Sequence, residues 1–484
     1  MKTSPGQRWT LALTSVAALM VSLDIQVVTT ALPAIRTQLH ATLAALEWTV
    51  NAYTLAFAVL LLTGAALGER LGRRRMLIAG VALFTAASAC CALAPDAGAL
   101  VAARAVQGAG SALMMPLAFA LVSAAFPPRR RAWAIGVFTS VTGLAVLAGP
   151  VLGGAVTQGI AWPWVFWLNV PIGLALIPLI ASRIPLDAQG PGAQGPGAGA
   201  AAGARNLDPG GLVLAGGAAF GLVWALIRAN GTGWGSPEVV ATLTAGAVLA
   251  GAFVAWERRA ASPMVPLPLF RARAFAAGNA ASFAMFGTLV AMVFFMAQFL
   301  QVGLGYGPLG AGLRLLPGWA TLALIAPFAG PAISRLGPRP LVAGGLALNA
   351  AGLAWTAAIA RAGLPYWQLV IPLVMAGTGA SLAIPAAASA VMGAAPPPMI
   401  GKASGTYNAL RQLGGVFGLA ICAAAFAARG GYASPAAFSA GIGPALGACA
   451  GLSAAGAAAG LFLPGRPRPG APAADGDRAL ESVG

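Results

Sequence analysis

Charged side chains are scarce in this chain of 484 residues. Asp, Glu, Lys and Arg make up 8% of the sequence and hydrophobic residues make up 59%. Soluble globular proteins carry about 25% charged residues. The mean hydropathy is +0.83. This small number of ionic groups cannot cover a water-exposed surface of this size. We therefore exclude a protein made of soluble domains and expect most of the surface to face lipid.

Histidine, cysteine and acidic residues are also few. The chain has one histidine, four cysteines and 11 acids, and the cysteines stand inside apolar runs without metal-ligand spacing. A membrane-embedded enzyme usually needs a cluster of His, Asp or Glu at one face, which this inventory argues against. We therefore predict no catalytic residues, no metal and no cofactor.

Long apolar runs, in contrast, fill the sequence. A hydrocarbon core needs roughly 20 apolar residues per helix. Continuous rather than alternating runs favour helices over the strands of a barrel. The predicted fold class is therefore an all-α polytopic membrane protein with 14 transmembrane helices, at 9–31, 47–68, 76–95, 98–124, 132–157, 162–183, 209–228, 237–256, 274–300, 309–332, 340–361, 366–390, 404–428 and 437–463.

The basic residues are distributed unevenly between the two sides of these spans. If the N-terminus is cytoplasmic, 21 of the 28 Lys and Arg fall in cytoplasmic segments, four in outer segments and three within spans. This bias follows the positive-inside rule. We predict a multi-pass protein of the inner (plasma) membrane, surrounded by the lipid bilayer, with both termini cytoplasmic. The net charge of +17 is then a topology signal, and we predict no nucleic-acid partner because no basic stripe is interleaved with exposed aromatics.

A weak internal repeat indicates two halves. The second span ends in Glu-Arg-Leu-Gly-Arg-Arg at 69–74 and the tenth in Ser-Arg-Leu-Gly-Pro-Arg at 334–339, so the ninth span would match the first. Two parallel halves are typical of a transporter whose substrate site lies between them near mid-bilayer. We expect a monomer with an N-terminal six-helix bundle at 9–184, a flexible cytoplasmic linker at 185–208, two inserted transmembrane helices at 209–256, a C-terminal six-helix bundle at 274–463 and a disordered cytoplasmic tail at 464–484.

Asp24 is the one carboxylate placed well inside a predicted span. A charge at such a depth costs at least about 2.5 kcal/mol, so Asp24 should face a cavity or a partner. Burial disfavours its charged form, so that a proton could load and unload it. Arg104, at a similar depth in the fourth span, is the expected partner. Two interpretations stay open, namely a proton-coupling pair and a purely structural ion pair.

Other polar residues within the spans are candidates for a substrate cavity. Arg411 either binds an anionic group or packs against its neighbours. Glu47, at the outer mouth of the second span, is interpreted as an interface residue rather than a coupling site. The candidate cavity residues are Asp24, Gln26, Asn51, Tyr53, Gln107, Asn408 and Arg411.

Two Gly-containing segments are candidates for conformational gating. In the loop after the second span, Gly72 permits a left-handed turn, and arginines offset Glu69 at the unfavourable end of a helix dipole. The alternative is that these arginines act as topology charges only. In the fifth span, Pro150 removes a helix hydrogen bond and its glycines allow bending and close packing. The candidate gating residues are Glu69, Arg70, Gly72, Arg73, Arg74, Gly149, Pro150, Gly153 and Gly154.

Six segments together resemble motifs of the major facilitator superfamily and, within it, of the fourteen-span drug:proton antiporters. They are the first-span segment 23–33, the loop 69–75, and the segments 104–110, 143–154, 162–173 and 408–415. The resemblance covers roughly residues 10–465. It implies two six-helix bundles of the major facilitator fold plus two inserted spans. The loop motif departs from the family pattern at Ala65 and Glu69, where Gly and Asp are usual, and Pro163 stands where Arg is usual.

The same resemblance implies proton-coupled export of small lipophilic compounds, such as drugs, dyes, antibiotics or secondary metabolites, across the plasma membrane by alternating access. The implied partners are a small-molecule substrate and protons. A proton-coupled uptake symporter of the same fold is the alternative, and the Gly-Pro segment of the fifth span argues against it. No acid is embedded in the second half, which makes a dicationic substrate less expected.

Overall fold

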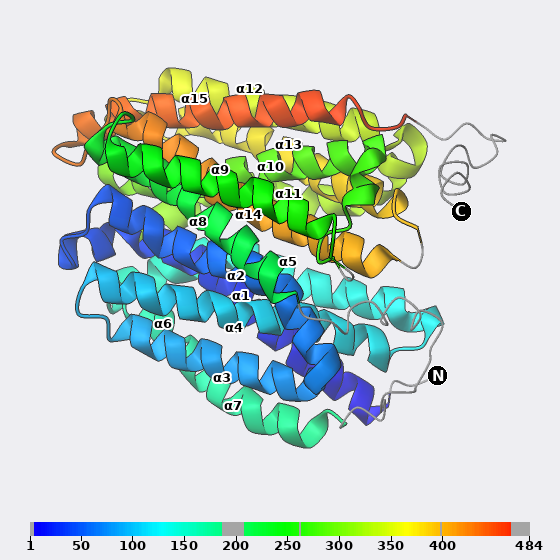
Figure 1. The fold of residues 1–484 in the computed structure, drawn as a ribbon. Coiled ribbons are helices and arrows are strands. Elements are labelled where there is room, and N and C mark those ends of the chain that lie inside the picture. The colour runs from blue at the N-terminus through cyan, green and yellow to red at the C-terminus, as the bar shows by residue number, and fades with distance from the viewer. Residues whose placement is uncertain (1–3, 186–207, 261–262, 397–398, 466–484) are drawn as a thin grey trace.

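The structure is a computed structural model that describes residues 4–185, 208–260, 263–396 and 399–465. The linker at 185–208 and the tail at 464–484 lie almost wholly outside these residues. Every regular element described is helical (Figure 1): α1 (Pro5–Gln38), α2 (Leu43–Leu71), α3 (Arg73–Ala92), α4 (Ala97–Ala125), α5 (Pro128–Gly159), α6 (Trp164–Trp167), α7 (Asn169–Arg183), α8 (Pro209–Thr232), α9 (Pro237–Glu257), η2 (Leu267–Arg271), α10 (Arg273–Gln298), η3 (Phe299–Gly303), α11 (Pro308–Leu336), α12 (Pro338–Ile359), α13 (Trp367–Gly393), α14 (Ile400–Ala427) and α15 (Pro435–Gly460).

The helices match the apolar runs in place along the chain. Among the described residues, thirteen helices are long and apolar enough to cross a membrane. The tenth predicted span corresponds to α11, a helix of 29 residues packed against α5 and α13. The sixth is built from α6 and α7, which meet at Leu168. The chain is therefore an all-helical, multi-pass membrane protein, and a total of fourteen spans stays a prediction.

Helix α1 is longer than the first predicted span. The apolar run suggested an end near residue 31, but α1 continues through Pro33 to Gln38 because a helix can extend beyond the hydrocarbon layer. Asp24 lies 14 residues, or about 21 Å, from that end. It therefore lies near the middle of its helix rather than near one end.

Two groups of helices lie side by side (Figure 1). Helices α1–α7 occupy the lower part of the view and α10–α15 the upper part. We call the boundary between these two groups the seam, and α8 and α9 cross in front of it. Across the seam, α5 packs against α11 and α2 packs against α14. Helix α8 contacts both α2 and α14, so the inserted pair covers one side of this interface.

The hydrophobic core is shared by both groups at one end of the molecule and divided at the other. One cluster joins Val50 of α2 to Phe426 of α14 and Phe438 of α15. Toward the other end, one cluster belongs to α1–α7 alone and another to the α10–α15 group alone. We call the end with the shared cluster the closed end, and it carries the connections 39–42 and 428–434. The second is the divided end, where the described chain begins and ends.

Candidate functional site

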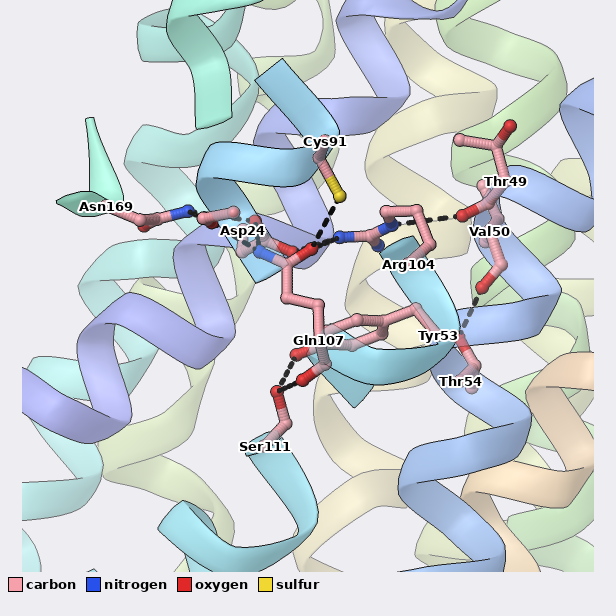
Figure 2. A network of polar contacts seen from close by, with 11 residues as sticks. Asp24, Thr49, Val50, Tyr53, Thr54, Cys91, Arg104, Gln107, Ser111 and Asn169 are labelled. Atoms are coloured by element: carbon pink, nitrogen blue, oxygen red, sulfur yellow. Dashed lines mark hydrogen bonds and ion pairs between the residues drawn. The ribbon is translucent and has the colours of Figure 1, made fainter. Parts of the chain in front are cut away.

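The Asp24 carboxyl is held by donors from two other helices (Figure 2). Asp24 on α1 is 2% exposed and Arg104 on α4 is 1% exposed. Arg104 Nη1 donates to Asp24 Oδ2 in a buried ion pair. Gln107, one turn further along α4, donates to Asp24 Oδ1 at 2.8 Å, and Asn169 of α7 donates to the same oxygen at 3.0 Å. The contact expected between Asp24 and Arg104 is thus present, while their roles stay predictions.

The Arg104 guanidinium has several partners as well. Its Nη1 donates to Gln107 Oε1 at 2.7 Å, and its Nε donates to the Thr49 carbonyl oxygen of α2 at 3.1 Å. Its carbon lies 4.2 Å from the centroid of the Tyr53 ring, a cation–π distance. A buried charge is tolerated only with such partners. The pair therefore ties α1, α2 and α4 together at the middle of the bundle.

A second layer of polar groups orients these donors. Ser88 of α3 accepts hydrogen bonds from Gln107 at 2.7 Å and from Asn169 at 3.1 Å. The Tyr53 hydroxyl and the Ser111 hydroxyl lie 2.6 Å apart, and Ser111 donates to the Gln107 carbonyl oxygen at 3.2 Å. The site is thus a closed network with few free hydrogen-bonding positions, which fixes the carboxyl in one orientation.

The other candidate cavity residues lie elsewhere. Gln26 packs beneath Gly149 where α1 crosses α5. Asn51 of α2 is fully buried, and neither atom of its amide has a hydrogen-bond partner among the described residues. Asn408 donates to the Ser404 carbonyl oxygen within α14 at 2.9 Å. Arg411 lies over the Phe286 ring at 4.8 Å. Of the predicted cavity residues, the structure therefore brings together Asp24, Gln107 and Tyr53, all three of which contact Arg104 or lie against it.

The loop between α2 and α3 has the geometry that its glycine predicts. Gly72 has a φ of +97°, which strongly favours glycine. Gly337, between α11 and α12, has a φ of +80°, so the two similar sequence segments form similar turns. Glu69 and Arg70 lie at the exposed surface, and Arg74 donates to the Ala181 carbonyl oxygen of α7. Arg73 is half-buried.

The Gly-Pro segment of α5 forms the seam between the two groups of helices. A Cβ on Gly153 would lie 2.6 Å from the Val27 carbonyl oxygen of α1. On the opposite face, a Cβ on Gly154 would lie 2.7 Å from the Pro308 carbonyl carbon of α11. Gly312 of α11 approaches the Pro150 carbonyl equally closely. The segment thus allows α5 to contact α1 and α11 backbone to backbone.

Three members of the Asp24 network, Ser88, Ser111 and Asn169, were not among the predicted site residues. Asn169 belongs to the segment 162–173, which the family resemblance singled out, so a polar residue inside an apolar run was a usable signal. Ser88 stands among alanines and carries no signal of its own. Its role appears only when α3 and α4 are packed together.

A separate apolar hollow lies away from this network. It has a volume of about 630 Å³ between α2, α4 and α8, and its lining includes Trp48, Phe220 and Trp224. Among the residues that the structure describes, no charged side chain lines it. Within the described residues, no group of three or more His, Cys, Asp or Glu side chains is placed to hold a metal ion.

Comparison with known proteins identifies the relatives of this chain. The sequence model described as Major Facilitator Superfamily matches residues 14–419. The tetracenomycin C resistance and export protein of Streptomyces glaucescens is 35% identical over 432 residues, which cover 89% of this chain and 78% of that protein. The cephamycin export protein CmcT of Amycolatopsis lactamdurans is 35% identical over 416 residues, covering 85% and 83%. The multidrug resistance protein Stp of Mycobacterium tuberculosis is 33% identical over 423 residues, covering 87% and 76%.

Solved structures agree with the fold. A transporter of the POT family, PepTSo, superposes with a TM-score of 0.71 at 14% identity, over 95% of this chain and 98% of that one. The xylose transporter XylE of E. coli superposes with a TM-score of 0.58 at 13% identity, over 93% and 97%. At these identities the likeness concerns the fold alone.

Proposed function

The chain belongs to the major facilitator superfamily, and on that premise we propose that it exports small lipophilic compounds across the plasma membrane in exchange for protons. It is a transporter of small molecules rather than an enzyme. Relatives named for the export of, or resistance to, tetracenomycin C, cephamycin and multiple drugs support export as the direction and antibiotics or secondary metabolites as the substrate class.

The observation that carries the proposed proton coupling is the buried ion pair of Asp24 and Arg104. A proton on Asp24 removes one of the two charges and leaves the Arg104 guanidinium without its counter-ion. Because an unpaired buried charge is far less favourable than a paired one, the protonated pair favours a different packing of α1 against α4. Proton binding at this carboxyl is therefore coupled to the position of α1.

The proposed coupling continues from α1 to the seam. Gln26 and Val27, two and three residues beyond Asp24, pack against Gly149 and Gly153 of α5. Gly154 on the other face of α5 packs against α11. A shift of α1 is thus transmitted by direct backbone contact to the interface between the two halves, which must rock for alternating access.

The proposed orientation places both termini in the cytoplasm, so that the closed end faces outward and the divided end faces the cytoplasm. The basic loop residues at 70–75 then lie on the cytoplasmic side, in agreement with the positive-inside rule. The shared core at the closed end, with two separate cores at the divided end, is the arrangement expected of a state that receives substrate from the cytoplasm.

We predict that Asp24→Asn abolishes active transport. In inverted membrane vesicles with an acidic interior, one proton exchanged for one monovalent cation drives about tenfold accumulation of the cation per pH unit. Uptake of ethidium, a lipophilic dye cation, is expected to reach that level with the native chain and with Asp24→Glu, and to fall to the passive level with Asp24→Asn.

Asp96→Asn is the matched control for this experiment. Asp96 is an exposed acid that caps α4 by accepting from the Ala99 amide at 2.9 Å, and Asn caps a helix equally well. Full pH-driven uptake by Asp24→Asn would refute the assignment. Dye movement out of preloaded vesicles together with protons, rather than uptake in exchange for them, would instead identify an uptake symporter.

A further inference from the structure

A second acidic side chain is buried at the closed end. Glu47 lies near the beginning of α2 and is 1% exposed. Its Oε2 has no hydrogen-bond partner among the described residues. Both carboxylate oxygens of Asp24, in contrast, accept hydrogen bonds. The two buried acids therefore differ in how well their carboxyl groups are hydrogen-bonded.

Glu47 lies at the contact between the two halves. Its nearest neighbours on α2, Leu46 and Val50, belong to the cluster that joins α2 to α14 and α15. Glu47 is within electrostatic reach of Tyr432, in the connection between α14 and α15. Burial raises the pKa of Tyr432, the nearby Arg36 lowers it, and Glu47 raises it.

Most charged and titratable groups around the closed end are engaged with other partners or exposed. Among the described residues, the buried Nε of Arg36 has no hydrogen-bond partner, although its guanidinium contacts Tyr432. The Arg36 guanidinium lies over the Tyr432 ring at 4.0 Å, and the Tyr432 hydroxyl donates to Gln298 Oε1 at 2.5 Å. Arg104 is paired with Asp24 and Arg228 with Glu238. The elements packed on α2 bring several titratable or charged groups toward this end. Within the described residues, no hydrogen bond or ion pair joins Glu47 to any of them. These groups are Arg36, His40, Cys90, Cys91, Asp96, Arg104, Arg228, Arg429 and Tyr432.

An ionised carboxylate without a partner is strongly disfavoured inside a protein, so this packing holds Glu47 as the neutral acid. Once α2 and α14 separate at the closed end, water reaches the carboxyl and it can release its proton. We propose that Glu47 is a second proton-binding site, on the outer side, whose protonation is linked to closure of the closed end. The step is a simple binding of one proton from the outer water to the carboxylate.

The direction of the linkage follows from this difference between the two states. The closed state binds one more proton than the open state, so acid outside favours closure and alkali favours opening. In the pH range where only the closed state is protonated, the ratio of closed to open molecules falls up to about tenfold per pH unit. The inference rests on the alternating access proposed above but not on the role of Asp24.

The test measures the distance between the two halves as a function of pH. Leu93 and Ala362 are exposed at the closed end, in the connections after α3 and α12. In a full-length chain whose four native cysteines are replaced by alanine, spin labels at Leu93→Cys and Ala362→Cys report the opening by pulsed electron resonance. The native Glu47 chain is expected to lose the short-distance population as pH rises across roughly pH 5 to 9.

Glu47→Gln resembles the neutral acid and is expected to keep the short distance at every pH. Glu238→Gln is the matched control, because Glu238 is an exposed acid paired with Arg228 near the same end, and it should retain the native response. The infrared band of a protonated carboxylic acid should also be present in the native chain at neutral pH and weaker in Glu47→Gln, a readout that does not depend on opening.

Two results would overturn the inference. One is an unchanged pH response in both Glu47→Gln and Glu47→Leu, and the other is a carboxylic acid band that Glu47→Gln leaves intact. Asp24→Asn separates this inference from the proposed export. If that variant loses dye export yet keeps the pH response at the closed end, Glu47 acts as proposed and Asp24 has its own role. If Asp24→Asn exports normally while Glu47→Gln fixes the short distance, the proton-coupling assignment of Asp24 fails and the Glu47 site stands.

Discussion

At the scale of single residues, the Asp24 carboxyl and the Arg104 guanidinium depend on each other. Both are almost completely buried, and each makes most of its strong hydrogen bonds within the same network. Loss of one partner leaves a buried charge without compensation, whereas loss of both leaves a neutral polar pocket. The two cases differ in energy because desolvation of the remaining charge dominates the first.

We predict a strongly non-additive stability change for this pair. Arg104→Gln should lower the free energy of unfolding by about 3–5 kcal/mol, and Asp24→Asn combined with Arg104→Gln should cost clearly less than the sum of the single changes. Thermal unfolding of the purified chain in detergent measures both. Arg228→Gln, which breaks the exposed pair with Glu238, should shift the transition little. Additive changes for Asp24 and Arg104 would contradict a coupled pair.

At the scale of the elements, α5 is the helix whose glycines set distances. Gly153 lets α1 approach from one side, and Gly154 lets α11 approach from the other. Gly143 lies on the same helix but a Cβ there would meet no atom within 4 Å. The seam therefore depends on particular glycines of α5 rather than on its general content of small residues.

We predict that Gly154→Ala and Gly312→Ala impair transport while Gly143→Ala does not. At the seam a Cβ would overlap backbone, and overpacking of this kind costs about 1–3 kcal/mol, which corresponds to roughly a 5- to 150-fold shift away from the closed seam. At Gly143, alanine should stabilise the helix by about 0.5–1 kcal/mol. Initial rates of dye uptake and thermal unfolding give the two readouts. Equal effects at all three positions would show that the seam contact has no special role.

At the scale of the whole molecule, the two halves share a core at the closed end and have separate cores at the divided end. Two bundles connected in this way can separate at one end without unfolding, because each retains its own hydrophobic interior. Helices α8 and α9 cross one side of the seam, where α8 contacts both halves. Rocking of the halves must therefore occur with α8 in contact with at least one of them.

We predict that the closed end faces the outside of the cell. Leu93 at the closed end is 68% exposed and Leu71 at the divided end is 55% exposed, so the two positions form a matched pair. In intact cells, a membrane-impermeant maleimide should label Leu93→Cys nearly completely and Leu71→Cys only at background level. Permeabilised cells should give labelling of both. The reverse pattern would invert the proposed topology and with it the proposed direction of transport.

Much of the architecture was predictable because it depends on local properties of the sequence. Apolar runs of membrane length predicted the helices, and a glycine in a charged loop predicted the positive φ of Gly72. Asp24 and Arg104 stood out because isolated charges in apolar runs are rare. Asn51 and Arg411 stood out as isolated polar residues in apolar runs, yet the network of Asp24 includes neither of them, since polarity alone does not tell which way a side chain points.

The sequence by itself determined that this protein crosses the membrane many times, where its helices lie and that Asp24 and Arg104 are embedded among them, because the cost of placing charge or unpaired backbone in hydrocarbon applies residue by residue. Only the tertiary structure decided that Asp24 meets Arg104, 80 residues away, together with Asn169 and Ser88. It also left the Glu47 Oε2 without a hydrogen-bond partner among the residues that the structure describes. The physical reason is that hydrogen bonding and burial depend on distances between helices, which are set by the packing of side chains from segments far apart in the chain.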